Sequence, residues 1–290
     1  MLSIDPKTVS TAELHGFLLS AVAPRPIAFA STMDKDGNVN LSPFSFFNVY
    51  SSKPPVMIFS ANRRVRDNST KHTLENVLET KEVVVNIVNF AIVQQASLSS
   101  TEYPKEVNEF EKSGLTMLKS DTVKPFRVAE SPVQFECKVN EVIALGDEGG
   151  AGNLIVCEVL KMHINEAVLG TDGKIDQHKI DLVSRMGGNW YCRANLGMFE
   201  VPKPLSSIGI GVDNIPSHIR YSKILTGNDL GILGNVDKLP TKEEINTYIE
   251  GSIKIREVLS TDDTEQIHKK AQEFIAQNDV LSAWKVLLAK

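Results

Sequence analysis

The chain has 290 residues, 42 % of them hydrophobic and 23 % charged, with a formal net charge of -5 at pH 7. This composition is typical of a soluble globular protein whose length allows one large domain or two small ones. The acidic balance argues against general affinity for nucleic acid, because no excess of cations is present to replace the counterions of phosphate. The three cysteines form no CxxC pair and the six histidines show no ligand spacing, so we expect neither a disulfide framework nor a metal site.

The first residues, MLSIDPKTVS, contain no basic stretch followed by an apolar core, so they do not read as a secretory signal. No apolar run approaches the roughly 20 residues that cross a bilayer. We therefore expect a cytoplasmic protein without a membrane partner.

The first two thirds of the chain combine β-forming segments with short helical ones. Apolar spacing and helix-start signals predict helices over residues 10–20, 69–80, 90–100 and 105–113. β-branched and aromatic residues predict strands over residues 26–33, 39–41, 56–61, 82–88, 133–144 and 153–163, the first two joined by the Asp-Gly turn DKDGN. Because the helices do not alternate regularly with the strands, we predict a mainly β, antiparallel protein whose strands close as a barrel.

The composition changes after the segment VPKP, where the β signals fade. Residues 240–259 and 263–289 predict two helices, the first with acidic residues in its first turn. We interpret residues 1–204 as one domain and residues 205–290 as a helical C-terminal extension that packs on the barrel or on a second subunit. Such a cover is expected because the extension carries an apolar stripe, formed by Ile267, Ala271, Phe274, Ile275, Leu281, Trp284, Leu287 and Leu288.

Three segments carry side chains suited to a planar, phosphorylated ligand. In PRPIAFAST (24–32), Arg25 stands between two prolines and offers a rigid guanidinium to an anion or a ring carbonyl. In NLSPFSFFN (40–48), three phenylalanines near Ser42 and Ser45 can wall a heterocycle whose edge the backbone binds. Both segments also have a simpler interpretation, a surface arginine in an extended stretch and phenylalanines packed in the core.

The third segment is a basic, hydroxyl-rich loop that opens a helix. Its cations are Arg63, Arg64, Arg66 and Lys71, and its hydroxyls belong to Ser60, Ser69, Thr70 and Thr73. Such charge-assisted donors, together with the free N–H groups of a helix start, bind phosphate monoesters. The simpler interpretation is a solvated charged loop. No nucleophile–base pair, P-loop or complete dinucleotide fingerprint accompanies these segments.

Taken in order, PRPIA…ST, NLSPFSFF, FS…R…KxT and VVVNIV resemble the flavin reductase-like proteins with an FMN-binding split barrel, which include flavoredoxin and the flavin-reductase components of two-component monooxygenases. The resemblance covers roughly residues 5–200. It implies a homodimer of six-stranded antiparallel Greek-key split barrels with inserted helices and with FMN at the dimer interface. The implied activity is hydride transfer from NAD(P)H to flavin, whose chemistry belongs to the cofactor and needs no acid–base pair.

The resemblance also implies positions for the cofactor-binding residues. Arg25 and Pro26 would border the flavin, Asn40, Leu41 and Ser42 would face its polar edge, and Ser45, Phe46 and Phe47 would line it. Ser60, Arg66, Lys71 and Thr73 would hold the ribityl phosphate, with Asn76 supporting the helix. Tyr191 and Arg193, in MGGNWYCR, would lie near the flavin. The chain departs from the family at His72, where an aspartate is common, and this change can alter phosphate binding or nicotinamide access.

Two other functions stay open at the level of the sequence. The chain can be an FMN-containing electron-transfer protein, like flavoredoxin, without NAD(P)H turnover of its own. It can also be a noncatalytic barrel that assembles through its helical extension. An oxygenase or another electron acceptor is the expected partner for the redox functions. NAD(P)H consumption and flavin uptake discriminate between the three hypotheses.

Overall fold

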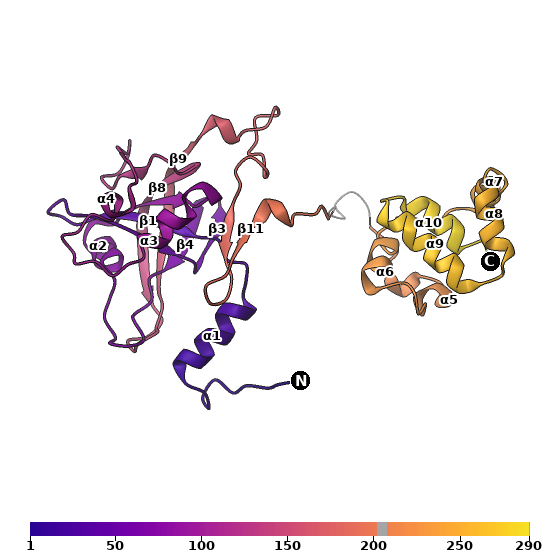
Figure 1. Cartoon of the computed structure of the whole chain (residues 1–290), viewed down its shortest axis with the longest axis horizontal. Helices are drawn as coiled ribbons and strands as arrows, with labels where there is room; N and C mark the ends of the chain where they lie inside the picture. Colours follow the sequence, from indigo (N-terminus) through magenta and orange to yellow (C-terminus); the bar gives the residue numbers. More distant parts are fainter. Residues whose placement is uncertain (202–207, 290) are drawn as a thin grey trace. The chain divides into compact units, whose positions relative to one another are not determined.

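The computed structural model describes residues 1–201 and 208–289. The chain divides into two compact units, Met1–Phe199 and Glu200–Lys290 (Figure 1). The domain boundary that the sequence predicts, between residues 204 and 205, lies outside the described residues. The first unit carries the sheet, and the second is helical.

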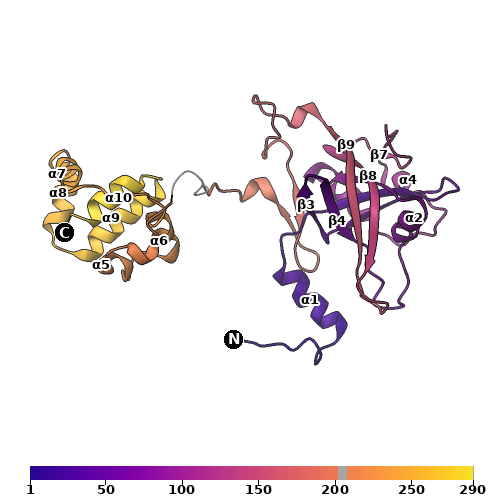
Figure 2. The same ribbon diagram turned by 180° about the vertical axis from the view of Figure 1, so that it is seen from behind.

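The first unit is built on one antiparallel sheet of seven strands. They are β1 (Ala28–Met33), β2 (Val39–Phe44), β3 (Phe47–Ser52), β4 (Pro55–Ser60), β5 (Glu82–Ile87), β8 (Val133–Ala144) and β9 (Asn153–Ile164), in the order β2-β1-β5-β8-β9-β4-β3. Figure 2 shows β8 and β9 as a long hairpin. Two short pairs lie outside this sheet: β6 (Met117–Leu118) with β7 (Arg127–Val128), and β10 (Val183–Arg185) with β11 (Tyr191–Arg193). The predicted mainly β, antiparallel character is confirmed.

The prediction of a closed six-stranded barrel is not confirmed. The sheet has seven strands and ends at β2 and β3, with no ladder between these two in the part of the chain that the structure describes. The additional strand is β3, whose asparagine and serines weaken the β signal of its sequence. Only Ser45 and Phe46 connect β2 to β3. A link of this length spans roughly 3.5 Å per residue, so the sheet must curl until its two end strands approach each other at this point.

Four α-helices accompany the sheet: α1 (Thr11–Ala21), α2 (His72–Thr80), α3 (Val93–Leu98) and α4 (Glu109–Ser113). Helix α1 has the predicted cap, in which the Glu13 N–H donates to the Ser10 hydroxyl at 3.2 Å. Successive side chains of β1 point to opposite faces of the sheet and enter two separate hydrophobic clusters. Ala28 packs in one cluster with α2, and Phe29 packs in the other with α3 and α4. The sheet is therefore covered by helices on both faces of β1.

The second unit contains α5 (Ser217–Arg220), α6 (Gly227–Leu233), α7 (Lys242–Glu250), α8 (Ile253–Ser260), α9 (Thr264–Ala276) and α10 (Val280–Leu287). No described helix of either unit has the length and apolar content needed to cross a membrane. Each of the two long helices predicted here is broken once. Ser252 starts α8 by accepting from the Ile255 N–H, and Asp279 starts α10 after the left-handed Asn278. These local caps override the continuous apolar spacing.

The apolar stripe of α9 and α10 is covered within the second unit itself. Most of its members pack in one cluster with Ile219 of α5, Leu233 of α6 and the nearby Ile215 and Leu225. Ile267 packs in a second cluster with Ile255 of α8. The Trp284 indole N–H donates to the Leu233 carbonyl at 3.1 Å. Only Leu281 of the stripe is largely exposed, at 55 %. The stripe thus forms a core within the second unit, and the packing of this unit on the barrel or on a second subunit stays a prediction.

Candidate functional site

A cavity of about 270 Å³ opens in the first unit, lined from α1, the end of β2 and the segment before α2. Its lining comprises His15, Pro43, Phe44, Ser45, Phe46, Ser60, Asn62, Arg63, Arg64, Val65, Lys71 and Gly150. The phenylalanine segment and the basic loop (residues 61–71) are separate in the sequence, and the fold brings them to one cavity. Aromatic rings and cations therefore face the same small volume.

Lys71 is a cation of this cavity without a counter-ion. Its half-buried ammonium lies 5.1 Å from the centre of the Phe44 ring. It forms no ion pair with any residue that the structure describes. Burial lowers the pKa of Lys71, and Arg64 lowers it further, while Glu102 acts in the opposite direction. An anion bound here would offset the cost of holding this charge partly out of water.

The helix that follows Lys71 begins without a side-chain cap. Lys71 is the N-cap residue of α2, and its side chain accepts no hydrogen bond from the first turn. Exposed N–H groups at a helix start, together with the helix dipole, attract anions. His72 is the first residue of this helix, half-buried and outside the cavity lining. The start of α2 thus adds backbone donors beside the Lys71 ammonium.

Two arginines of the basic loop line the cavity, and both form hydrogen bonds with other residues of the same loop. Arg63 donates to the side-chain oxygen of Asn68 at 2.6 Å and to its carbonyl at 2.9 Å. Arg64 donates to the Ser69 hydroxyl at 3.0 Å and to the Thr70 carbonyl at 2.5 Å. These bonds orient both guanidinium groups before any ligand arrives.

Arg66, which the resemblance placed at the phosphate, is engaged in ion pairs outside the cavity lining. Its side chain is 68 % exposed and pairs with Asp67 at 3.0 Å and with Glu102. It is not among the lining residues, whereas Arg63 and Arg64 are. The sequence singles out all three as loop cations. Arg64 and Arg66 contact Glu102, which lies 36 positions beyond Arg66, and no local pattern reveals that partner.

Three predicted site residues lie beneath the cavity instead of in its wall. Asn40 donates to the hydroxyls of Thr32 and Thr73 at 3.2 and 2.9 Å, and Asn76 donates to Thr32 at 3.1 Å. All four side chains are buried. This cluster fastens α2 to β1 and β2, so Asn40, Thr73 and Asn76 position the helix start. Thr32 was missed, because a hydroxyl within a strand has no distinguishing sequence signal.

Leu41, Ser42 and Pro26 also stay out of the cavity lining. Leu41 is fully buried in the core, and its N–H donates to the Glu109 carboxylate at 3.0 Å. Burial raises the pKa of Glu109, whose hydrogen bonds come from backbone N–H groups. Ser42 is half-buried and Pro26 is exposed. The predicted contact of these three with a flavin edge is not visible in the cavity.

Arg25 is only 6 % exposed and fastens three parts of the chain. Its guanidinium donates to the carbonyls of Leu19 and Val22 at the end of α1, at 2.5 and 2.6 Å, and to the Met186 carbonyl at 2.9 Å. Its Nε lies 3.5 Å from the hydroxyl oxygen of Ser45, which lines the cavity. The rigid guanidinium expected from the PRP segment is present, but it acts on the cavity through Ser45.

Phe46 lines the cavity and Phe47 does not. The Phe46 ring is 38 % exposed and meets His15 edge-on, with the ring centres 6.3 Å apart. Phe47 is partly buried and packs against the core, and its contact with a flavin stays a prediction. Ser60 lines the cavity as predicted and donates to the side-chain oxygen of Asn62 at 2.8 Å.

The glycine-rich segment GDEGGAGN holds the basic loop in place and was missed as part of the site. The Gly150 N–H donates to the Arg63 carbonyl at 3.1 Å, with φ at +96°. A Cβ on Gly149 would stand 3.0 Å from the Val65 carbonyl oxygen. Only glycine allows so close an approach of two backbones. The run of glycines was the sequence signal that could have indicated this close backbone contact.

Tyr191 and Arg193 lie on the β10–β11 hairpin and outside the cavity lining. Arg193 forms a two-pronged pair with Asp181 at 2.8 and 2.7 Å and lies over the Phe90 ring at 4.0 Å. The Arg185 guanidinium lies 4.6 Å from the centre of the Tyr191 ring. Both predicted residues are engaged within the first unit.

Known proteins share this arrangement of sheet and loops. Residues 20–178, more than half of the chain, match the model of the flavin reductase like domain. The chain belongs to the flavin reductase-like family. It is 40 % identical to an uncharacterized protein of Aquifex aeolicus over 181 residues, which are 62 % of this chain and 90 % of the relative. It is 31 % identical to the uncharacterized protein YwrF of Bacillus subtilis over 188 residues, 64 % of this chain and 91 % of YwrF.

Solved structures extend the likeness of this flavin reductase-like chain to its fold. Nitrilotriacetate monooxygenase component B from Bacillus cereus is 28 % identical, with a TM-score of 0.65, over 69 % of this chain and 98 % of that one. A putative flavin reductase with a split barrel domain from Shewanella frigidimarina is 26 % identical, with a TM-score of 0.59, over 70 % and 100 %. The family expected from the sequence is thereby confirmed. The family match ends at residue 178, so the helical unit lies outside it.

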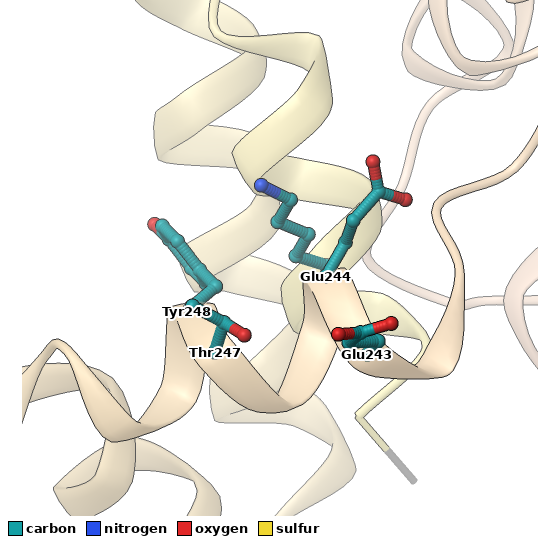
Figure 3. A pocket seen from close by; sticks show the side chains of 5 residues that line it. Glu243, Glu244, Thr247 and Tyr248 are labelled. Atoms are coloured by element: carbon teal, nitrogen blue, oxygen red, sulfur yellow. The ribbon is translucent and has the colours of Figure 1, made fainter.

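The second unit of this flavin reductase-like chain contains a cavity of about 420 Å³ (Figure 3). It is lined by Glu243, Glu244, Thr247, Tyr248 and Lys285. Glu244 already completes a capping box with Thr241, and the Lys285 ammonium lies 5.2 Å from the centre of the Tyr248 ring. These charged groups serve the helices themselves, so the cavity of the first unit is the better candidate despite its smaller volume.

Asp121, Glu136 and His163 offer ligand atoms within 4.8 Å of one another. The fully buried Glu136 carboxylate accepts from the Asp121 N–H at 2.8 Å, from the Thr122 N–H and hydroxyl at 2.5 Å each, and pairs with His163 at 2.7 Å. Burial alone would raise the pKa of Glu136, but these donors outweigh it and lower the pKa to about 2. Because its oxygens are already occupied by the chain, we interpret the cluster as a structural lock.

Proposed function

We propose that this chain is an FMN-binding oxidoreductase that reduces flavin with NADH or NADPH. The observation that carries the proposal is Lys71, a half-buried ammonium at the uncapped start of α2 that has no counter-ion in the described part of the chain. A phosphate monoester has a charge of about -1.5 to -2 at pH 7 and would supply that counter-ion. Arg63 and Arg64 line the same cavity and add charge-assisted donors.

The cavity fits the phosphorylated end of FMN better than the whole molecule. Its volume of about 270 Å³ lies just below the roughly 300–1,000 Å³ of pockets that enclose a complete ligand. Phe46 offers an exposed ring at the cavity, and Val49 and Tyr50 of β3 are 60 % and 66 % exposed. We propose that the ring system uses this apolar surface and that a second copy covers it, in a homodimer of split barrels.

When bound, the flavin supplies the redox chemistry by accepting a hydride from the nicotinamide. The residues of this chain bind and orient it. Lys71, Arg63 and Arg64 would hold the phosphate, and the buried cluster around Thr32 keeps the start of α2 in place. Arg25 fixes the position of Ser45 in the wall. Because the flavin supplies the chemistry and the chain supplies the binding, the cavity needs no nucleophile–base pair.

We further propose that the reduced flavin serves an oxygenase or another electron acceptor in the cytoplasm. The likeness to a protein named as a component of nitrilotriacetate monooxygenase supports an oxygenase as that acceptor. The proposal concerns the first unit, because the helical unit lies outside the family match.

The visible spectrum of the purified full-length chain tests the proposal. After FMN is added and the excess removed, flavin absorption bands should remain with the protein. They should bleach under anaerobic conditions when NADH or NADPH is supplied. Titration with riboflavin, which lacks the phosphate, should show weaker binding than titration with FMN. Equal affinity for FMN and riboflavin, or no retained flavin, would contradict the proposal.

One outcome of the same experiment favours the electron carrier. In that case the flavin is retained and is reduced by dithionite, but neither NADH nor NADPH bleaches it. Turnover with added FMN favours the reductase.

A further inference from the structure

Glu102 lies beside the basic loop but comes from the segment after α3. Its two carboxylate oxygens pair with different arginines: Oε1 with Arg64 Nε at 2.9 Å, and Oε2 with Arg66 Nη2. We propose that Glu102 makes the cavity selective for flavins that end at their first phosphate, so that it favours FMN over FAD. This inference rests on the proposed function and adds a selectivity residue to it.

The ion pairs divide the cations of the loop into two groups. Glu102 neutralises Arg64 and Arg66, and Asp67 pairs with Arg66 as well. Arg63 and Lys71 have no carboxylate partner among the residues that the structure describes. Their two positive charges match the about -1.5 to -2 of a terminal phosphate monoester. A ligand that ends there is therefore compensated without breaking any existing pair.

The same pairs oppose a ligand that continues beyond its first phosphate. In FAD that phosphate is joined to a second phosphate and adenosine, so negative charge extends past the cations of the cavity wall. Arg64 pairs with Glu102, which also pairs with Arg66, and the side chains of Glu102 and Arg66 are 46 % and 68 % exposed. A second phosphate near them meets the Glu102 carboxylate and finds Arg66 already paired. The repulsive element that produces selectivity is thus the carboxylate.

Binding of FMN, FAD and riboflavin to the full-length chain tests this assignment, with flavin fluorescence as the readout. Replacing Glu102 removes the repulsion and one of the two carboxylates that pair with Arg66, so Glu102→Gln should raise the affinity for FAD relative to FMN by about two- to fivefold, the range expected of an exposed ion pair. Riboflavin affinity should not change. The gain should shrink as salt concentration rises, because exposed charges are screened.

Three further variants separate selectivity from folding. Glu106→Gln removes an equal charge from the same segment, at an exposed position outside the ion pairs of the basic loop, and should keep the wild-type FAD-to-FMN ratio. Glu102→Asp retains the charge and should also keep it. In the double variant Glu102→Gln, Arg66→Gln, the part of the gain that Arg66 contributes should be lost, while the part that comes from removing the carboxylate should remain.

An unchanged FAD-to-FMN ratio in Glu102→Gln, with normal FMN binding, would overturn this inference alone. The same holds if Glu106→Gln shifts the ratio as much as Glu102→Gln does, since the effect would then be general charge. Absence of FMN binding to the wild-type chain would instead overturn the proposed function, and this inference with it.

Discussion

Helix α2 of the first unit starts differently from α6 and α7 of the second unit. In the second unit, α6 and α7 each begin with a capping box, Thr226 with Asp229 and Thr241 with Glu244. In the first unit, α2 begins at Lys71 without a side-chain cap. A capped start has already satisfied part of its N–H groups, whereas an uncapped start beside an unpaired ammonium keeps its donors for a ligand. The comparison teaches that unsatisfied groups mark the candidate site better than cavity volume or charge count does.

The largest effect is expected at Glu136 of the first unit, whose hydrogen bonds are satisfied within the chain, as are those of the capped helix starts in the second unit. Glu136→Gln should lower the free energy of unfolding of the first unit by about 3 kcal/mol at pH 7, because the buried amide presents N–H groups to the donors that Glu136 now accepts from. FMN affinity should stay within about twofold, since Glu136 does not line the cavity. Urea denaturation followed by circular dichroism measures the first effect. A loss below about 0.5 kcal/mol would show that the lock is weak.

The pH dependence of the unfolding free energy tests the role of Glu136 in a second way. The pKa of Glu136 in the folded chain is lowered from 4.5 to about 2. Its contribution to stability is therefore complete above the ordinary value and is lost as pH falls through the folded value. Between about pH 5 and pH 2, stability should fall less steeply in Glu136→Gln than in the wild type. Parallel curves would contradict the assignment.

The next largest effect is expected at the uncapped start of α2, where Lys71 lies. Lys71→Gln should raise the dissociation constant of FMN by about 30-fold, or about 2 kcal/mol, because a charge-assisted contact with the phosphate is lost. Riboflavin affinity and the unfolding free energy should change little. Lys119→Gln, at an exposed position outside the cavity lining, is the matched control. Equal losses for FMN and riboflavin would mean that Lys71 does not meet a phosphate.

Removing a cap in the second unit should act on stability only. Thr241→Ala breaks the capping box of α7 and should lower the free energy of unfolding of that unit by about 1 kcal/mol. Trp284 is 1 % exposed and reports on that unit, so its fluorescence in a Trp190→Phe background follows the transition. FMN affinity should not change. Thr247→Ala, within the same helix, should be neutral or slightly stabilising.

The smallest effect concerns pH and the ammonium of the cavity. Because the pKa of Lys71 is lowered, the free chain loses this charge at a lower pH than an ordinary lysine does. FMN affinity should therefore fall as pH rises, and the fall should begin at a lower pH than the ordinary lysine pKa of 10.5 would produce. Lys71→Arg stays charged throughout and should flatten the curve. A flat wild-type curve would separate Lys71 from phosphate binding.

Much of the fold could be predicted because its signals are local. The DKDGN turn produced the hairpin of β1 and β2, and the capping-box spacing of Ser10 and Glu13 produced α1. Strand β3 was missed, because its pairing with β4 depends on a neighbour and not on its own pattern. The breaks before α8 and α10 were missed because apolar spacing continued across them while short side chains capped new helices.

The candidate site was predicted as segments more accurately than as side chains. The phenylalanine segment and the basic loop do line one cavity, and Ser45, Phe46, Ser60 and Lys71 are in its wall. Asn40 was expected there too, but long-range hydrogen bonds to the Thr32 and Thr73 hydroxyls draw it under the helix start. Such partners lie on different elements, so spacing along the chain cannot identify them.

By itself, the sequence determined the mainly β character, the family and the two segments that form the cavity. Turn chemistry, capping residues and ordered motifs act within a few positions, and they can be recognised without a structure. The tertiary structure decided that Arg63 and Arg64 line the cavity while Arg66 does not, that Glu102 pairs with Arg64 and Arg66, and that Lys71 has no carboxylate partner among the described residues. The direction of a charged side chain depends on which carboxylate, distant in the sequence, the fold brings close to it. The distance between the two charges is set only when the chain folds.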